Sequence, residues 1–184
     1  MTSGAATDFH SHLVPGVDDG AADIVESRVA VAAMVRDGVT TAIVTPHFDG
    51  SLTLAPHMLQ ERLAQLDAGF AQLTVDAEIA ARGLRLLRGV ELMLDVPDPD
   101  VSDERLRLGG GRFVLVEYPG LQLPLAHADF AIRALRQNGW QPVVAHPERY
   151  RNVDESLEQL LPLRYAGAYF QVNAGSLIGL HGDG

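Results

Sequence analysis

Five apolar, β-branched runs alternate with segments of helical period, and this alternation constrains the fold more than any other feature of the sequence. The strand-like runs cover residues 41–45, 84–90, 113–116, 142–145 and 169–172. Helical segments lie near residues 23–38, 56–82, 128–138 and 155–166, the last with a kink at Pro162. The repeated βα order predicts a single α/β domain, residues 1–184, with a mainly parallel sheet that is either open or closed.

Local signals mark where these helices begin and end. Asp23 and Glu26 have the spacing of a capping box at the start of the first helix. A glycine follows each predicted helix, as is typical of helix C-termini, at Gly38, Gly83, Gly139 and Gly167.

A histidine or a carboxylate stands at the end of five successive strands, counted from the opening segment. Four apolar runs lead into His47, Glu91, Glu117 and His146 in turn, and the opening segment DFHSH carries His10 and His12. The carboxyl ends of the strands form the active-site face of parallel βα barrels. We therefore expect these side chains to converge, although they are distant in sequence.

Each of these residues also has a simpler interpretation. In a strand, His10 and His12 would point to the same side and could meet one ion, but one could instead cap a helix while the other lies on the surface. His47 alone could be a core or capping residue. A buried carboxylate needs a partner, which for Glu91 and Glu117 could be an arginine, Arg88 or Arg112, rather than a metal.

The amino-acid composition excludes some kinds of functional site and favours others. The chain has no cysteine, which excludes disulfides, thiolate zinc sites and cysteine nucleophiles. Its 14 basic residues against 24 acidic ones give a formal net charge of −10, which argues against non-specific nucleic-acid binding and suits metal cations. An imidazole and carboxylate ligand set suits Mn²⁺, Fe²⁺ or Zn²⁺. The sequence has no run apolar enough to span a membrane and no signal peptide, so a cytoplasmic protein is expected.

Six motifs together resemble a known family. DFHSHLVPGVDDG, VTPHF, GVEL, VEYP, AHPERY and QVNAGSLIG occur in this order over about residues 8–180. They resemble the PHP (polymerase and histidinol phosphatase) superfamily, and within it the bacterial CpsB/CapC-type tyrosine-protein phosphatases. The resemblance implies a distorted (β/α)7 barrel, here with six βα units and therefore incomplete, around a trinuclear, usually manganese, centre.

The resemblance also implies a role for individual residues. It assigns His10, His12 and Glu91 to the first metal, Glu91, Glu117 and His146 to the second, and Asp18 and His47 to the third. It identifies Arg149 as the arginine that grips the substrate phosphate, beside Glu91 and His146 as catalytic residues.

The implied function is hydrolysis of phosphotyrosine by a metal-bound hydroxide. The implied substrate is the phosphotyrosine-bearing tail of a bacterial tyrosine kinase that controls capsule or exopolysaccharide synthesis. Two alternatives stay open. One is a phosphatase of a small phosphomonoester such as histidinol phosphate, and the other is a catalytically silent metal-binding module.

The C-terminal part differs from the family pattern. Family members continue to a strand that ends in Asp-x-His, whereas this sequence ends in GLHGDG, where His181 and Asp183 have the reverse order. We interpret these two as tail residues. We therefore expect two well-held metals at most, slow hydrolysis of phosphotyrosine, and an unpaired sheet edge near 169–172 that invites formation of a homo-oligomer.

Overall fold

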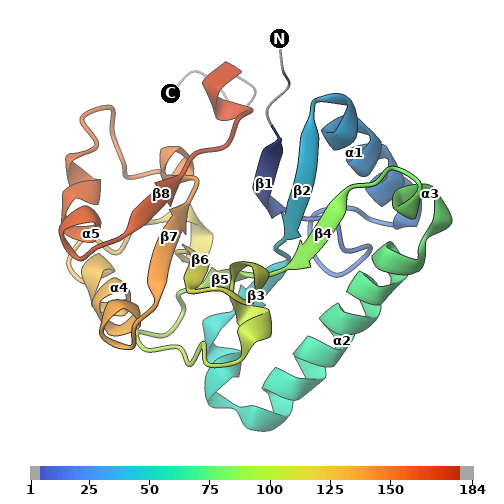
Figure 1. Ribbon diagram of the computed structural model, residues 1–184. Coiled ribbons are helices and arrows are strands. Elements are labelled where there is room, and N and C mark those ends of the chain that lie inside the picture. The colour runs from blue at the N-terminus through green and yellow to red at the C-terminus, as the bar shows by residue number, and fades with distance from the viewer. Residues whose placement is uncertain (1–4, 179–184) are drawn as a thin grey trace.

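The computed structural model describes residues 5–178, so His181 and Asp183 lie outside the described residues. Its centre consists of parallel strands in two hydrogen-bonded sheets (Figure 1). One sheet has the order β1-β2-β4, formed by Ala6–Ser11, Val39–Val44 and Arg85–Arg88. The other has the order β3-β5-β6-β7-β8, formed by His47–Asp49, Glu91–Met93, Phe113–Glu117, Gln141–Ala145 and Tyr169–Gln171.

The two sheets are halves of one curved surface. Strand β2 passes into β3 across Thr45 and Pro46, and β4 passes into β5 across Gly89 and Val90. Proline cannot donate to a strand ladder, so the pairing breaks there. Hydrogen bonds nevertheless cross the break, from Gly89 N–H to Val44 O and from Glu91 N–H to Pro46 O, both at 3.0 Å. The strands therefore occupy six positions in chain order, which confirms the incomplete barrel expected from the sequence.

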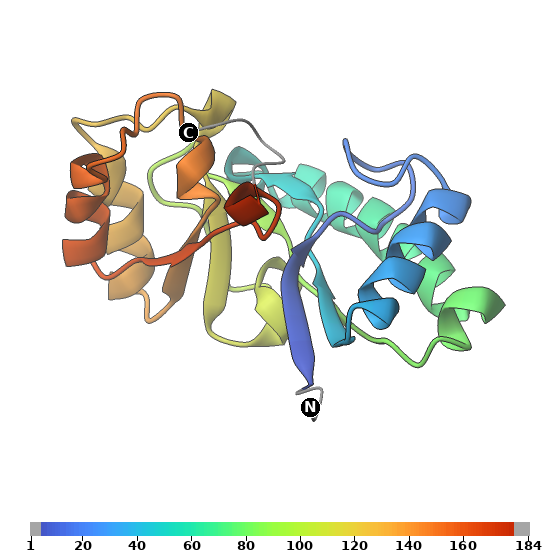
Figure 2. The same ribbon diagram turned by 90° about the horizontal axis from the view of Figure 1, so that it is seen from above.

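Helices cover the outside of this surface. They are α1 (Ile24–Arg36), α2 (Pro56–Val75), α3 (Ala77–Ala80), α4 (Ala128–Gln137) and α5 (Leu161–Tyr165). Helices α1–α3 flank β1, β2 and β4, whereas α4 and α5 lie on the opposite flank beside β7 and β8 (Figure 2). Short 3-10 turns complete the described connections: Gly50–Leu54, Glu104–Leu106, Leu108–Gly110, Pro119–Leu121, Pro147–Arg149, Glu158–Leu160 and Ser176–Ile178.

The capping residues predicted from the sequence are found at helix ends in the structure. Asp23 accepts hydrogen bonds from the Val25 and Glu26 N–H groups, and Glu26 accepts one from the Ala22 N–H at 2.8 Å. Asp23 thus caps the helix as expected, whereas Glu26 accepts from the N–H one residue before the N-cap and not from the N-cap N–H of a standard capping box. The four glycines predicted to end helices all have positive φ, as the left-handed C-terminal position requires.

Two predicted helices are shorter than expected. The segment 56–82 breaks at Asp76, whose side chain caps α3 and pairs with Arg28 on α1 at 2.7 Å. This contact comes from a distant element, so helical periodicity could not show it. The segment 155–166 begins as a helix at Leu161, because Pro162 suits a first turn and not a helix interior.

The core has two main clusters of buried side chains. One contains buried side chains of β5, β6, α4 and α5, such as Leu92, Val116 and Ile132. The other joins α1, β2, α2 and α3. Val17 packs against both clusters, which anchors the loop after β1 to the rest of the molecule. Within residues 5–178, no helix combines the length and the hydropathy that crossing a membrane requires.

We predict that Gly69→Ala destabilises the protein, although alanine is the better helix former by about 1 kcal/mol. Gly69 lies in α2, and a Cβ there would stand 2.3 Å from Val14 Cγ1 in the loop after β1. Overpacking of this kind costs about 1–3 kcal/mol. Urea unfolding should show a lower midpoint with an unchanged m-value. Adding Val14→Ala should recover part of the loss, and a Gly69→Ala variant more stable than wild type would contradict the packing.

Candidate metal centre

The residues that follow the strands do converge, as the sequence predicted. His10 lies in β1 and His12 just after it, His47 begins β3, Glu91 begins β5, Glu117 ends β6 and His146 follows β7. Parallel pairing sets His47 beside Glu91 and Met93 beside Glu117. The carboxyl ends of neighbouring strands thus bring these six side chains to one place.

Glu91 is the centre of the cluster. Its side chain is fully buried, and four imidazoles approach its two oxygens. Oε1 lies 2.8 Å from His146 Nε2 and 3.3 Å from His10 Nε2. Oε2 lies 3.1 Å from His47 Nδ1 and 3.3 Å from His12 Nε2, yet makes no hydrogen bond. A buried carboxylate oxygen without a hydrogen-bond partner requires an explanation, and a metal ion would supply one.

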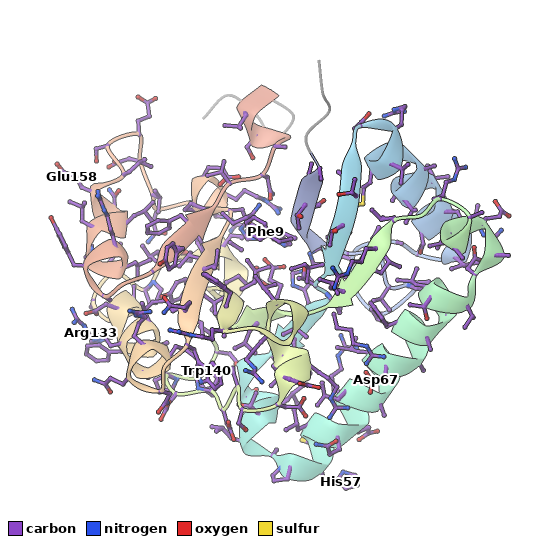
Figure 3. All side chains as sticks on the ribbon, in the orientation of Figure 1. Phe9, His57, Asp67, Arg133, Trp140 and Glu158 are labelled. Carbon is purple, nitrogen blue, oxygen red and sulfur yellow. The ribbon has the colours of Figure 1, made fainter. Side chains whose placement is uncertain are left out.

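The structure does not pair Glu91 or Glu117 with an arginine within the described residues. Arg88 pairs with Asp67 of α2, which Figure 3 labels, and Asp67 also pairs with Arg105 at 3.0 Å. Among the ion pairs of residues 5–178, those of Glu91 and Glu117 are with histidines. Glu117 lies 2.9 Å from His47 Nδ1 and 3.9 Å from His146 Nε2.

Three sets of donor atoms lie close enough to hold a metal ion. In each set the atoms are within 4.8 Å of one another. The sets are His10, His12 and Glu91; His12, Asp19 and His47; and His47, Glu91 and Glu117. Shared residues link the three sets into one continuous centre.

Asp18 and Asp19 have different positions in the site. The sequence predicts Asp18 as a metal ligand, whereas the donor sets of the described residues include Asp19. Asp18 Oδ2 accepts from His12 Nδ1 at 2.8 Å and from the His47 N–H at 3.0 Å, while Oδ1 accepts from the Gly20 N–H. Asp18 therefore lies behind His12 and orients it. Asp19, with its side chain 81% exposed, reaches His47 Nε2 at 3.1 Å and belongs to a donor set.

One sequence signal could have separated the two aspartates. In the order Asp-x-Gly, the first carboxylate readily accepts from the N–H two residues ahead and closes an Asx turn. Asp18 does this with Gly20. Both oxygens of Asp18 thus accept hydrogen bonds within the protein, whereas Asp19 faces the histidines of the centre.

The ionisable side chains of the cluster shift one another's pKa values. Burial alone would raise the pKa of Glu91, but the nearby imidazoles of His10, His12 and His146 hold that pKa well below its usual range. Burial opposes charging of His12, yet its hydrogen bond to Asp18 and the nearby Glu91 carboxylate raise its pKa to about 10. The bond to Glu117 raises the pKa of His47 despite partial burial. Burial would likewise raise the pKa of Asp18, and the bond with His12 lowers it.

This donor set fits divalent cations. The centre combines imidazole nitrogens with carboxylate oxygens, one of them buried and without a hydrogen-bond partner, and buried charge requires compensation. His146 Nδ1 is likewise buried without a partner. A metal ion bound by these residues would supply the positive charge that the buried Glu91 carboxylate requires.

A cavity of about 940 Å³ opens beside the cluster. Its lining includes the six strand-end residues, Asp19 and the exposed Arg149. Arg149 lies in the 3-10 turn Pro147–Arg149. Its backbone N–H donates to the His146 carbonyl at 2.9 Å. His146 itself has φ +34°, a strained conformation for a residue with a side chain, and it sends the chain directly into this turn. The turn therefore ties a cation to the carboxylate-rich centre.

Comparison with known proteins identifies relatives along nearly the whole chain. The family model for capsular polysaccharide synthesis proteins, CpsB/CapC, matches residues 6–184. The tyrosine-protein phosphatase YwqE of Bacillus subtilis is 32% identical over 178 residues, and the tyrosine-protein phosphatase CpsB of Streptococcus pneumoniae is 28% identical over 169 residues. The matches cover 95% and 91% of this chain and 67% of each relative.

Comparison with solved structures identifies the same group of relatives. One chain from the crystal structures of YwqE from Bacillus subtilis and CpsB from Streptococcus pneumoniae, which are metal-dependent tyrosine phosphatases, matches with a TM-score of 0.73 at 31% identity. The match covers 97% of this chain and 70% of that chain. These findings confirm the resemblance seen in the motifs. The assignment of residues to individual metals stays a prediction.

We predict that Asp19→Ala and Asp18→Asn act on different properties. Asp19→Ala should lower the number of Mn²⁺ ions bound per chain, measured by equilibrium dialysis, and leave the melting temperature of the metal-free protein unchanged, because its side chain is mostly exposed. Asp18→Asn should lower that melting temperature. It sets an amide against three N–H donors, and losing a charged hydrogen bond costs about 1.5–3 kcal/mol. Equal effects of both variants on metal content alone would contradict these separate roles.

Proposed function

The chain belongs to the CpsB/CapC family of capsular polysaccharide synthesis proteins, and we propose that it is a metal-dependent phosphatase acting on phosphotyrosine in proteins. The observation that carries the proposal is the buried Glu91, ringed by four histidines, beside a cavity that also contains Arg149. One cavity thus contains both the residues that could bind metal ions and an arginine that could bind phosphate. Metal-dependent hydrolysis of a phosphomonoester needs both.

We assign the metal ligands by combining the donor sets with the family pattern. Glu91 is the shared carboxylate, with one oxygen toward His10 and His146 and the other toward His12 and His47. Glu117 and Asp19 complete the carboxylate ligands, and Asp18 orients His12. Mn²⁺ is the proposed metal because mixed imidazole and carboxylate sites suit it, and Fe²⁺ and Zn²⁺ suit the same donors.

The protein's own groups have separable tasks in the reaction. Divalent ions at this centre would supply charge that acidifies a water molecule and neutralises phosphoryl oxygens. Arg149 would bind the phosphate, since its planar fork matches two oxygens at once. His146 would hold Glu91 in place through the 2.8 Å contact to Oε1.

The proposed substrate is the phosphotyrosine-bearing tail of a bacterial tyrosine kinase, in the cytoplasm. Support comes from the names of the relatives, which are tyrosine-protein phosphatases, and from the family's part in capsular polysaccharide synthesis. The cavity is open and lined partly by exposed residues, as access by a protein chain requires.

We predict that a phosphotyrosine peptide is hydrolysed, that exhaustive chelation abolishes phosphate release, and that Mn²⁺ restores it. The chain has no cysteine to supply a thiol nucleophile, so the reaction depends on the metal centre. Full activity after chelation would exclude the metal mechanism.

Two controls separate the alternatives. Histidinol phosphate, assayed in parallel, should react more slowly than the peptide, and the reverse order would favour a small-molecule phosphatase. Metal content is measured on the same samples. Bound Mn²⁺ without turnover of either ester would favour a silent metal-binding module.

We predict that Arg149→Lys lowers kcat/KM by about 10–100-fold, the loss that corresponds to one charged hydrogen bond. Lysine keeps the charge and loses the fork. Arg151→Lys is the matched control, because Arg151 is also exposed and does not line the cavity. Melting temperatures of both variants should equal that of wild type. A change of less than about threefold, as for an exposed ion pair, would refute the phosphate-binding role.

A further inference from the structure

Gln171 lies beside the proposed metal centre and has no part in the function described so far. It is the last residue of β8 and is buried. Its Oε1 accepts two hydrogen bonds, from His10 Nδ1 at 2.8 Å and from the His146 N–H at 3.2 Å. Its Nε2 donates to Asn173 Oδ1 at 2.8 Å.

The main chain fixes which way this amide faces. The His146 N–H can only donate, so the Gln171 atom that faces it must be the oxygen. A flipped amide would set two donors against each other in a buried place, at a cost of a lost hydrogen bond and more.

The orientation of the amide in turn determines the tautomer of His10. The atom that faces His10 Nδ1 is the same oxygen, so Nδ1 must carry a proton. His10 Nε2 then faces the centre, 3.3 Å from both Glu91 Oε1 and His12 Nε2. The main-chain N–H of His146 therefore determines the tautomer of the His10 ring, because both groups bond the same oxygen of Gln171.

His12 has a comparable arrangement with a different partner. Its Nδ1 bonds to Asp18 Oδ2 at 2.8 Å, which leaves its Nε2 toward Glu91. Histidine ligands of metals characteristically donate their second ring N–H to such a partner, which fixes the tautomer and the ring orientation.

We propose that Gln171 is a positioning residue that holds His10 in the Nδ1–H tautomer and aims its Nε2 at the metal centre. The proposal rests on the metal centre of the proposed function and is independent of the ester that is hydrolysed. It also gives the motif QVN a chemical role, since Gln171 and Asn173 together orient the amide.

The direct test is NMR of the 184-residue chain with ¹⁵N-labelled histidine, loaded with Zn²⁺ as a diamagnetic probe. A long-range ¹H–¹⁵N spectrum distinguishes the two ring nitrogens, and the His10→Gln variant identifies the His10 signals. We expect a protonated His10 Nδ1 whose N–H exchanges slowly with solvent. A proton on Nε2, or coordination through Nδ1, would overturn the proposal.

Variants separate positioning from packing. Gln171→Leu removes the acceptor and should weaken Zn²⁺ binding about 10–100-fold, as loss of such a partner does, with loss of the slowly exchanging N–H. Gln171→Glu keeps an acceptor oxygen and should retain both the signal and most of the affinity. Gln141→Leu is the matched control, since Gln141 is a partly buried glutamine at the far end of β7.

Each outcome decides the proposal. Wild-type affinity in Gln171→Leu, or equal losses in the Leu and Glu variants, would overturn it. If Gln171→Leu fails to fold, the wild-type spectrum still gives the tautomer. Absence of phosphatase activity with Mn²⁺ bound would refute the proposed function and leave this inference standing, whereas a wild-type chain that binds neither Zn²⁺ nor Mn²⁺ would overturn both.

Discussion

The fully buried carboxylate of Glu91 is the interaction on which the centre depends. An isolated charge at such depth is costly, and it is tolerated where opposite charge and hydrogen bonds surround it. Here the compensation comes from imidazoles on β1, on β3, after β1 and after β7. These elements span both hydrogen-bonded sheets, so the position of one side chain couples the two halves of the fold.

The bend between the two sheets makes this arrangement geometrically feasible. Thr45 and Pro46 interrupt one strand, and Gly89 and Val90 interrupt its neighbour at the matching level. The chain resumes directly with His47 and Glu91, which pair side by side. Pro46, which has no N–H donor, and Gly89, which has no side chain, thus redirect the two strands just before His47 and Glu91.

Much of this arrangement could be predicted from the sequence because it follows from strand order. Parallel strands bring their carboxyl ends to one edge, so the convergence of Glu117 and His146 with the histidines of the first strand required no detailed geometry. Predictions failed where a distant contact decides local structure. Arg28 stabilises the break at Asp76, which helical periodicity could not show. The assignment of Asp18 as a metal ligand stays a prediction, and its hydrogen bond to His12 is a contact that the sequence did not indicate. The hydrogen bonds of Gln171 had no sequence signal at all, because an isolated glutamine in a strand is ordinary.

The two histidines of the His-x-His pair differ in how far along the chain their supports lie. His12 is held by Asp18, six residues away, within a loop that Val17 anchors to both core clusters. His10 is held by Gln171, 161 residues away, on a strand in the other sheet. The support of His12 can form with the loop, whereas that of His10 requires β8 to have paired with β7. Within the described residues, the side chain of Gln171 bridges β1 and β8, which do not pair as strands. The geometry of the first donor set therefore depends on completion of the sheet, and a weakening of β8 should loosen His10 while leaving His12 in place.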